Sequence, residues 1–263
     1  MEKFVSNLEY TLVAAAILVV LQYFFSSVKQ QKIIRADAKT DVFYWLLENT
    51  LLGLISKAII AVFVTFILLA KTDALSGLSV LRSLVYWQQI ILILILADFV
   101  GYWVHRLMHK GWFWRLHSIH HSSKELDWLS AVRFHPLETV FIISVVYLVV
   151  SVPFGYDNKL IGAALTIRSL YGYFVHSNLK WGLGAVGYLM SNPKFHRWHH
   201  TMEKEGIDKN FGGFFSIWDY IFGTFYLPSD SKIQPHNFGV KDNVGDSVIK
   251  QLYFPFVDYK KHK

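Results

Sequence analysis

The sequence contains apolar segments long enough to cross a lipid bilayer. The first runs from about 8 to 28 and includes TLVAAAILVVLQYFF, and the third, from about 84 to 104, includes IILILILADF. A second lies within 42–70 and contains Glu48 and Lys57, so its first part is predicted to tilt or to lie at the interface. A spanning helix needs about 20 apolar residues. With a mean hydropathy of +0.32, the chain is too apolar for an ordinary soluble domain.

Two shorter apolar segments, 137–152 and 160–175, are joined by PFGYDNK and predict a hairpin that crosses only part of the bilayer. The first segment of the chain lacks a strongly basic start and a small-residue cleavage site, so it predicts an anchor and not a signal peptide. The expected fold is therefore an all-α, multi-pass membrane protein with about four transmembrane helices.

Basic residues in the connections predict the orientation in the membrane. The connection between the second and third segments has only Lys71 and Arg82. The connections after the first and third segments are richer in Lys and Arg: Lys29, Lys32, Arg35, Lys39, and Arg106, Lys110, Arg115, Lys124, Arg133. The positive-inside rule places these two connections, and with them every histidine, in the cytoplasm. The net charge of +7 fits loops beside anionic headgroups, and no nucleic acid partner is expected.

Eight of the twelve histidines occur in three groups with helical spacing. VHRLMH has the spacing i, i+4, whereas HSIHH and HRWHH each have i, i+3, i+4. The residues are His105, His109, His117, His120, His121, His196, His199 and His200. These spacings put the rings of each group on one helix face, where imidazoles can converge on a metal ion. A lone histidine is more often a hydrogen-bonded core residue, but that interpretation does not explain three such groups.

Other polar residues lie beside these groups. Asn192 and Pro193 are suited to the N-cap and first turn of a helix that carries HRWHH. His135 precedes the fourth apolar segment, in RFHPLE, and His176 follows the fifth, in YFVHSN. Asp98 lies two turns before His105 within an apolar segment, and it is predicted to be an outer partner of a metal-bound histidine.

The number of histidines indicates which metal the site holds. Eight to ten imidazoles exceed one zinc site and suit two ions with five or six ligands each. The chain has no cysteine, which excludes thiolate ligands, and no ExxH motif, which excludes the soluble carboxylate-bridged bundles. We therefore expect two iron ions with dioxygen as co-substrate, and zinc is a possible substitute in purified protein.

The order HRLMH, HSIHH, RFHPLE, HSN, NPKFHRWHHT, KNFGG, WDYIFGTFY, from Asp98 to Tyr226, resembles the fatty acid hydroxylase/sterol desaturase superfamily of membrane di-iron enzymes. The resemblance implies a set of transmembrane helices carrying a cytoplasmic helical cap that holds a dinuclear metal site. It implies as metal ligands the eight histidines above together with His176, and also His135, which matches the family's HP position. Some relatives place an HxxxH pair later, and here Gly172 stands at its first position.

The resemblance also covers residues that are not histidines. A C-terminal signature with a structural role is implied: Asn210, Phe211, Gly212, Trp218, Asp219, Gly223 and Thr224. Arg133 and Glu138 are expected to form an orienting pair around His135. His236 and His262 have no counterpart and are predicted to be exposed to solvent. The chain is divided into N-terminal membrane anchors (1–82), a catalytic domain (83–228) and a cytoplasmic tail (229–263).

The chemistry implied is dioxygen-dependent hydroxylation or desaturation of a C–H bond in a lipid that enters from the bilayer. GLGAVG, at 182–187, has the form of the dinucleotide-binding GxGxxG motif, but it follows no predicted strand and therefore predicts a loop. Electrons are therefore expected from a separate donor of the reductase, ferredoxin or cytochrome b5 type. Four tryptophans are candidates either for a lipid entrance or for an interfacial belt: Trp103, Trp112, Trp114 and Trp128.

Two alternatives remain open at this point. A carotenoid hydroxylase or an acyl desaturase would use the same chemistry, although the HxxxH spacing of the first group and the HP motif argue against the desaturase. A non-catalytic metal transporter or store would place its ligands near the middle of the membrane. A bacterial inner membrane is the favoured location, and the C-terminal KKHK keeps the endoplasmic reticulum possible.

Overall fold

The structure, a computed structural model, describes residues 2–69, 79–154, 157–230 and 233–257 and is built from helices and loops in these ranges. The long helices are α1 (Glu2–Phe25), α2 (Ala38–Leu47), α3 (Gly53–Leu69), α5 (Tyr86–Met108), α7 (Pro136–Phe154) and α8 (Asn158–His176). The shorter ones are η1 (Glu48–Leu52), α4 (Ser79–Arg82), α6 (Phe113–His121), η3 (Trp128–Val132), η4 (Gly184–Tyr188), α9 (Pro193–His199), α10 (Ile217–Ile221), α11 (Val248–Tyr253) and η5 (Phe254–Phe256).

Three helical segments are long and apolar enough to cross a membrane: Leu8–Phe25, Ala38–Phe63 and Tyr86–Met108. A shorter apolar helix, Pro136–Ser151, is followed by α8, as the predicted hairpin requires. The second segment is helical throughout although it contains the charged residues Glu48 and Lys57. In this segment α2 continues into α3 through η1, which is a π-helical turn. The prediction of an all-α membrane protein is confirmed.

Helices α5, α7 and α8 form the main apolar core. Ala97 of α5 and Ala164 of α8 are both fully buried in it, with Val150 of α7. Small residues let helix backbones approach closely, which is how helices associate within a membrane. At the start of α8, the side chain of Asp157 accepts hydrogen bonds from Lys159 N and Leu160 N and caps the helix.

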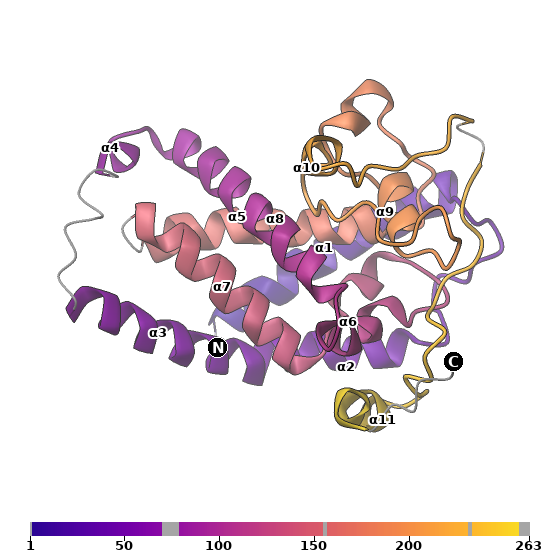
Figure 1. The fold of residues 1–263 in the computed structure, drawn as a ribbon, viewed down its shortest axis with the longest axis horizontal. Helices are drawn as coiled ribbons and strands as arrows, with labels where there is room; N and C mark the ends of the chain where they lie inside the picture. Colours follow the sequence, from indigo (N-terminus) through magenta and orange to yellow (C-terminus); the bar gives the residue numbers. More distant parts are fainter. Residues whose placement is uncertain (1, 70–78, 155–156, 231–232, 258–263) are drawn as a thin grey trace.

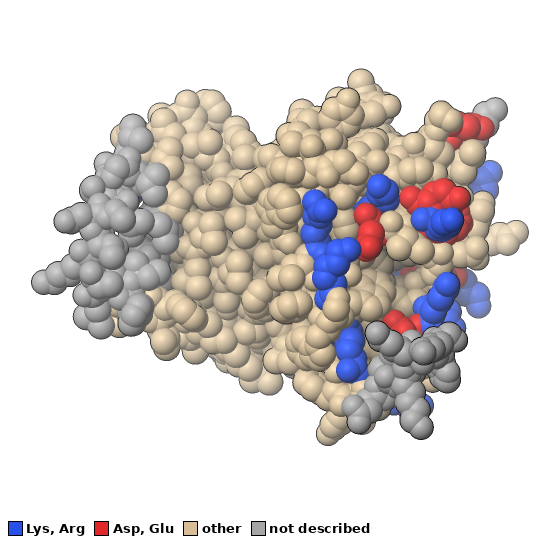
Figure 2. Space-filling model, in the orientation of Figure 1, with Lys and Arg blue, Asp and Glu red and all other residues tan. Residues whose placement is uncertain are grey.

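Among the shorter elements, α4 lies at one end of the long helices, whereas α6, α9, α10 and α11 gather at the opposite end (Figure 1). We call this the polar end, made of residues 109–135, 177–230 and 233–257. Figure 2 shows that the Lys, Arg, Asp and Glu residues visible on this face lie at the polar end, while most of the remaining surface carries no charge. This distribution suits helices that lie in lipid and an end that lies in water.

Candidate metal centre

Nine of the ten predicted histidines come together where the long helices meet the polar end, and there they form two groups. The five-histidine group consists of His105, His109, His117, His121 and His199. The four-histidine group consists of His120, His176, His196 and His200. Within each group, the candidate ligand atoms lie within 4.8 Å of one another. The side chains come from the ends of α5 and α8, from α6, and from α9 with its C-cap.

The geometry explains the repeated HxxHH spacing. In α6, His117 and His121 are four residues apart and join the five-histidine group, whereas His120 joins the four-histidine group. In α9 the assignment is reversed, because His196 and its i+4 neighbour join the four-histidine group while His199 joins the five-histidine group. Successive residues of a helix point about 100° apart, so adjacent histidines serve different groups and each helix connects both.

The ring nitrogens within a group are spaced as ligands of one ion would be. His117 Nε2 lies 3.0 Å from His105 Nε2 and 3.2 Å from His121 Nε2. In the other group, His196 Nε2 lies 2.9 Å from His176 Nε2 and 3.0 Å from His200 Nε2. Ligands about 2.0–2.1 Å from one metal ion are roughly 3 Å apart when they are adjacent. The residues therefore fit two metal ions.

Two further nitrogens support the same interpretation. His109 Nε2 and His199 Nε2 are buried and have no hydrogen-bond partner among the described residues. A buried nitrogen without a partner costs free energy unless something else satisfies it. Both belong to the five-histidine group, so a metal ion bound there would satisfy them.

Hydrogen bonds on the outer side of the rings fix the orientation of six histidines. Each Nδ1 faces an oxygen acceptor, so the ring donates there and its Nε2 keeps a lone pair for a metal. The pairs are His105–Phe211 O (2.7 Å), His109–Asp208 Oδ1 (3.2 Å), His117–Glu138 Oε1 (2.5 Å), His120–Arg133 O (3.2 Å), His176–Gly172 O (2.8 Å) and His199–Lys209 O (2.7 Å).

Two of these acceptors are carboxylates that the sequence did not reveal as partners of histidine. Glu138 is fully buried, whereas the Asp208 side chain is 47% exposed and also pairs with Lys110 at 3.1 Å. The hydrogen bond from His109, together with Lys110, lowers the pKa of Asp208 to about 2. No local spacing could have shown either pairing, because Asp208 is 99 residues from His109 and Glu138 is 21 residues from His117.

His135 belongs to neither group, which corrects the prediction that it binds the metal. Its Nδ1 accepts a hydrogen bond from Leu137 N at 3.2 Å, and its Nε2 donates to Leu252 O at 3.2 Å. Both nitrogens are therefore used in holding the start of α7 and the end of α11. The expected pair between Arg133 and Glu138 is also wrong, because Glu138 bonds His117 and Arg133 bonds Asp41.

Asp98 does not contact a histidine in the described residues, contrary to the expectation of an outer partner. Its carboxylate accepts hydrogen bonds from Phe214 N and Phe215 N, both at 2.8 Å, and from Trp218 Nε1 at 3.1 Å. It also lies 3.6 Å from Arg168 Nε. Asp98 thus ties α5 to the loop whose Phe211 carbonyl receives the hydrogen bond of His105.

The C-terminal signature builds this same loop. Asp219 accepts hydrogen bonds from Phe211 N and Gly212 N, both at 2.7 Å, and burial raises its pKa to about 6. Asn210, at a φ of +61°, donates through Nδ2 to Phe195 O and Tyr226 O. These contacts give the signature a structural role beside the site.

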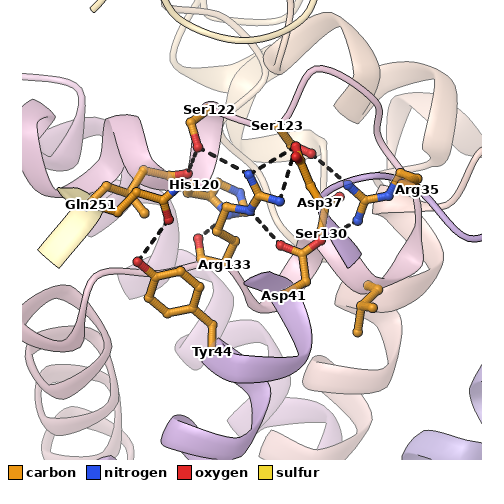
Figure 3. A network of polar contacts seen from close by, with 12 residues as sticks. Arg35, Asp37, Asp41, Tyr44, His120, Ser122, Ser123, Ser130, Arg133 and Gln251 are labelled. Atoms are coloured by element: carbon orange, nitrogen blue, oxygen red, sulfur yellow. Dashed lines mark hydrogen bonds and ion pairs between the residues drawn. The ribbon is translucent and has the colours of Figure 1, made fainter. Parts of the chain in front are cut away.

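A buried ionic network joins the N-terminal part of the chain to the four-histidine group (Figure 3). Asp41 of α2 lies between the guanidinium groups of Arg35 and Arg133, and Arg133 Nε donates to its Oδ1 at 2.5 Å. Arg35 also pairs with Asp127 at 2.7 Å. The carbonyl of Arg133 accepts the hydrogen bond of His120, so the network holds the backbone that orients this ring.

The remaining histidines and the residues between them can now be placed. His236 is exposed, as predicted, and His262 lies outside the described residues. Arg197 is buried and its guanidinium lies 4.7 Å from the ring of Phe238, while Trp198 packs against Tyr226. Burial lowers the pKa of Arg197 to about 10. Both side chains therefore support the loops around α9 and belong to neither histidine group.

The histidines of α6 and α9 predict a stability that falls in acid. Burial, followed by the proximity of other rings, lowers the pKa of His117, His121 and His199 from the ordinary 6.5. The unfolded chain therefore binds more protons than the folded chain below about pH 6.5, so the free energy of unfolding decreases as the pH falls below that value. Metal is lost in the same direction, because only neutral rings bind it. Thermal unfolding between about pH 8 and 5, with and without metal, tests this, and a midpoint that is constant or rises toward acid would contradict it.

Replacing Glu138 with alanine is expected to weaken metal binding by the five-histidine group about 10–100-fold, the usual effect of losing an outer partner. Without the carboxylate, His117 loses the acceptor that fixes which nitrogen carries its proton. Glu138→Gln is the matched control, since it keeps an acceptor oxygen and is expected to lie between the two. Metal titrations of the purified variants measure the change. Equal affinity in Glu138→Ala and the unchanged protein would contradict the assignment.

The fold and the site define a membrane protein of helices with a buried polyhistidine centre at the end of its long helices. Among known proteins this chain belongs to the fatty acid hydroxylase family, whose model matches residues 90–224. No solved structure matches it.

Several curated relatives share part of their length with this chain. It is 31% identical over 176 residues to ornithine lipid hydroxylase OlsE of Rhizobium tropici, which is 64% of this chain and 50% of that protein. It is 30% identical over 164 residues to alkylglycerol monooxygenase of Caenorhabditis elegans, which is 62% of this chain and 31% of that protein. It is also 30% identical to methylsterol monooxygenase 2-2 of Arabidopsis thaliana, covering 52% of each. The chain thus spans about a third to a half of these relatives.

Proposed function

We propose that this protein is a dioxygen-dependent di-iron oxidoreductase that hydroxylates or desaturates a C–H bond of a membrane lipid. The observation that carries the proposal is the division of nine histidines, seven of them buried and two half-buried, into two groups, each able to surround one ion. Two iron ions bound there would supply the activation of dioxygen. Relatives named for an ornithine lipid, an alkylglycerol and a methylsterol support a lipid substrate.

The residues of the chain have three tasks in this proposal. The histidines hold the ions, and their outer hydrogen bonds fix the rings before substrate arrives. The surrounding helices exclude water, since His120, His121, His196 and His200 are all buried.

The proposal divides the chain into three parts: residues 83–228 form the catalytic part, 1–82 provide anchors and 229–263 form a tail. The lipid approaches from the bilayer along α5, where Trp103 is exposed.

The proposal places the polar end in the cytoplasm, as the Lys and Arg distribution favours. A separate electron donor of the reductase, ferredoxin or cytochrome b5 type delivers two electrons there. A bacterial inner membrane is the favoured location and the endoplasmic reticulum the alternative. Zinc is a possible substitute for iron in purified protein, because imidazole also suits zinc.

Comparative lipid profiling tests the function. Aerated cells that express the protein are expected to contain a lipid gaining one oxygen atom or losing two hydrogen atoms, and cells expressing His199→Ala are expected to lack it. Purified protein with iron should consume dioxygen when given a reductant and a lipid extract. If the protein holds two irons, consumes no dioxygen and leaves the lipids unchanged, a non-catalytic metal-binding or transport role replaces this proposal.

A further inference from the structure

One region of the polar end combines exposed apolar side chains with a lack of charge. Segment 181–193 contains no Asp, Glu, Lys or Arg, and segment 210–229 contains only Asp219, which is buried. Six large apolar side chains of these two segments are exposed, and together we call them the apolar edge: Leu183, Val186, Tyr188, Leu189, Tyr220 and Ile221. Figure 2 shows no charged residue on the visible surface around α10. Exposed apolar surface of this extent normally marks an interaction site.

The two segments of the apolar edge are fixed to each other, so the exposure belongs to a defined surface. Ser216 Oγ donates to Gly187 O at 2.9 Å, and the rings of Tyr188 and Phe225 stack with centroids 5.4 Å apart. At Gly187 a Cβ atom would lie 2.2 Å from Gly182 O, so only glycine allows this close turn. The GLGAVG sequence therefore builds a tight turn that presents Val186 outward.

The apolar edge is continuous with the surface of a membrane-spanning helix. Phe222, next to Ile221, packs on Trp103 of α5 with centroids 4.9 Å apart, and Phe99 packs on Trp218 at 5.1 Å. Trp103 is 43% exposed and lies five residues before the end of α5. At 1.5 Å per residue, the contact is about 8 Å below the end of this span. The edge thus begins where α5 leaves the apolar part of the bilayer.

We propose that the apolar edge inserts into the headgroup region of the bilayer beside α5 and fixes the polar end against the membrane surface. Tyrosine and tryptophan favour this region because their rings are apolar and their tips are polar. Short apolar elements without charge bind a lipid surface by burying their side chains at the boundary between headgroups and acyl chains. Neither the metal nor the reaction enters this argument, so its failure would leave the proposed function untouched.

Single cysteine substitutions can test the position of the edge, because the natural chain contains no cysteine. Val186→Cys and Ile221→Cys place a spin label on the edge, at side chains that are 53% and 58% exposed. Ile207→Cys is the matched control, because it is 51% exposed on the same polar end but lies between Glu205 and Asp208. The full-length labelled proteins are reconstituted into phosphatidylcholine vesicles, and relaxation by dioxygen, which partitions into lipid, is compared with relaxation by a water-soluble nickel chelate.

Labels at 186 and 221 are expected to be more accessible to dioxygen than to nickel, and the label at 207 is expected to show the opposite order. If all three labels respond like the one at 207, the edge lies in water and the proposal is overturned. A second copy of the chain is the other possible occupant. It would shield the edge labels from both agents and give spin–spin broadening that disappears on dilution with excess lipid, which would also overturn the proposal.

Discussion

Replacing His120 with alanine is expected to remove the metal ion of the four-histidine group and to leave the five-histidine group loaded. His121→Ala is expected to do the reverse, although the two residues are adjacent in the sequence. The reason is that α6 directs these rings into different groups. Each variant loses a direct ligand, so its affinity should fall by more than the roughly 10–100-fold typical of losing an outer partner. Because both ions are needed in the proposed reaction, either variant should be inactive.

The measurement is the metal content of the purified variants, together with a spectroscopic signature of the remaining ion. About one ion per chain is expected in each variant and about two in the unchanged protein. His236→Ala is the control, since this histidine is exposed and lies outside both groups. Loss of both ions from both variants, with the fold intact by circular dichroism, would contradict the assignment of neighbouring histidines to separate ions. The pair His199→Ala and His200→Ala repeats the test on α9.

Asp41→Asn is expected to destabilise the protein more than any other single change in the ionic network. The carboxylate lies between Arg35 and Arg133 and has no exposed surface. Removing its charge leaves two buried guanidinium groups. Their remaining anionic partners are the buried Asp127 beside Arg35 and the half-exposed Asp37 beside Arg133. Breaking a buried ion pair in this way typically costs about 3–5 kcal/mol. The movement of Arg133 should also weaken the hydrogen bond of its carbonyl with His120, and with it the affinity of the four-histidine group.

Asp37→Asn is the matched control, because Asp37 pairs with the same Arg133 at 3.4 Å but its side chain is 42% exposed. An exposed pair contributes about 1 kcal/mol or less. Thermal unfolding in detergent compares the two variants, and metal titration compares their affinities. If Asp41→Asn is as stable as Asp37→Asn and binds metal equally well, the network does not hold the site. A loss of stability with unchanged metal affinity would limit its role to the fold.

Local features of the sequence were sufficient for the membrane segments and for the helices that carry the histidines. Apolar segments of sufficient length predicted α1, the α2–η1–α3 helix and α5, because a span must be continuous along the chain. Asn192 and Pro193 correctly predicted the start of α9, where Asn192 Oδ1 accepts a hydrogen bond from Phe195 N at 3.0 Å. Helical spacing of i, i+3 or i+4 identified eight of the ten predicted ligands, since helical periodicity is itself a local property, and the family resemblance added His176.

Contacts between distant segments were decided only by the tertiary structure. His135 was predicted to be a ligand, as His120 was, but α7 begins at Pro136 in a position that directs His135 toward Leu252. Asp98 was expected beside a histidine and Glu138 beside Arg133, and nothing in the sequence singled out Asp41. Their actual partners include loop amides for Asp98, His117 for Glu138 and Arg133 for Asp41, which come from other parts of the chain.

The sequence by itself therefore determined a helical membrane protein with histidines grouped on helix faces, because both properties repeat within one helix. The tertiary structure decided which histidines share an ion, which acidic groups orient them, and that His120 and His121 belong to different groups. The physical reason is that spacing along a helix fixes the direction of a side chain relative to its own axis. The position of that axis relative to other helices depends on packing, and packing is set by contacts far apart in the sequence.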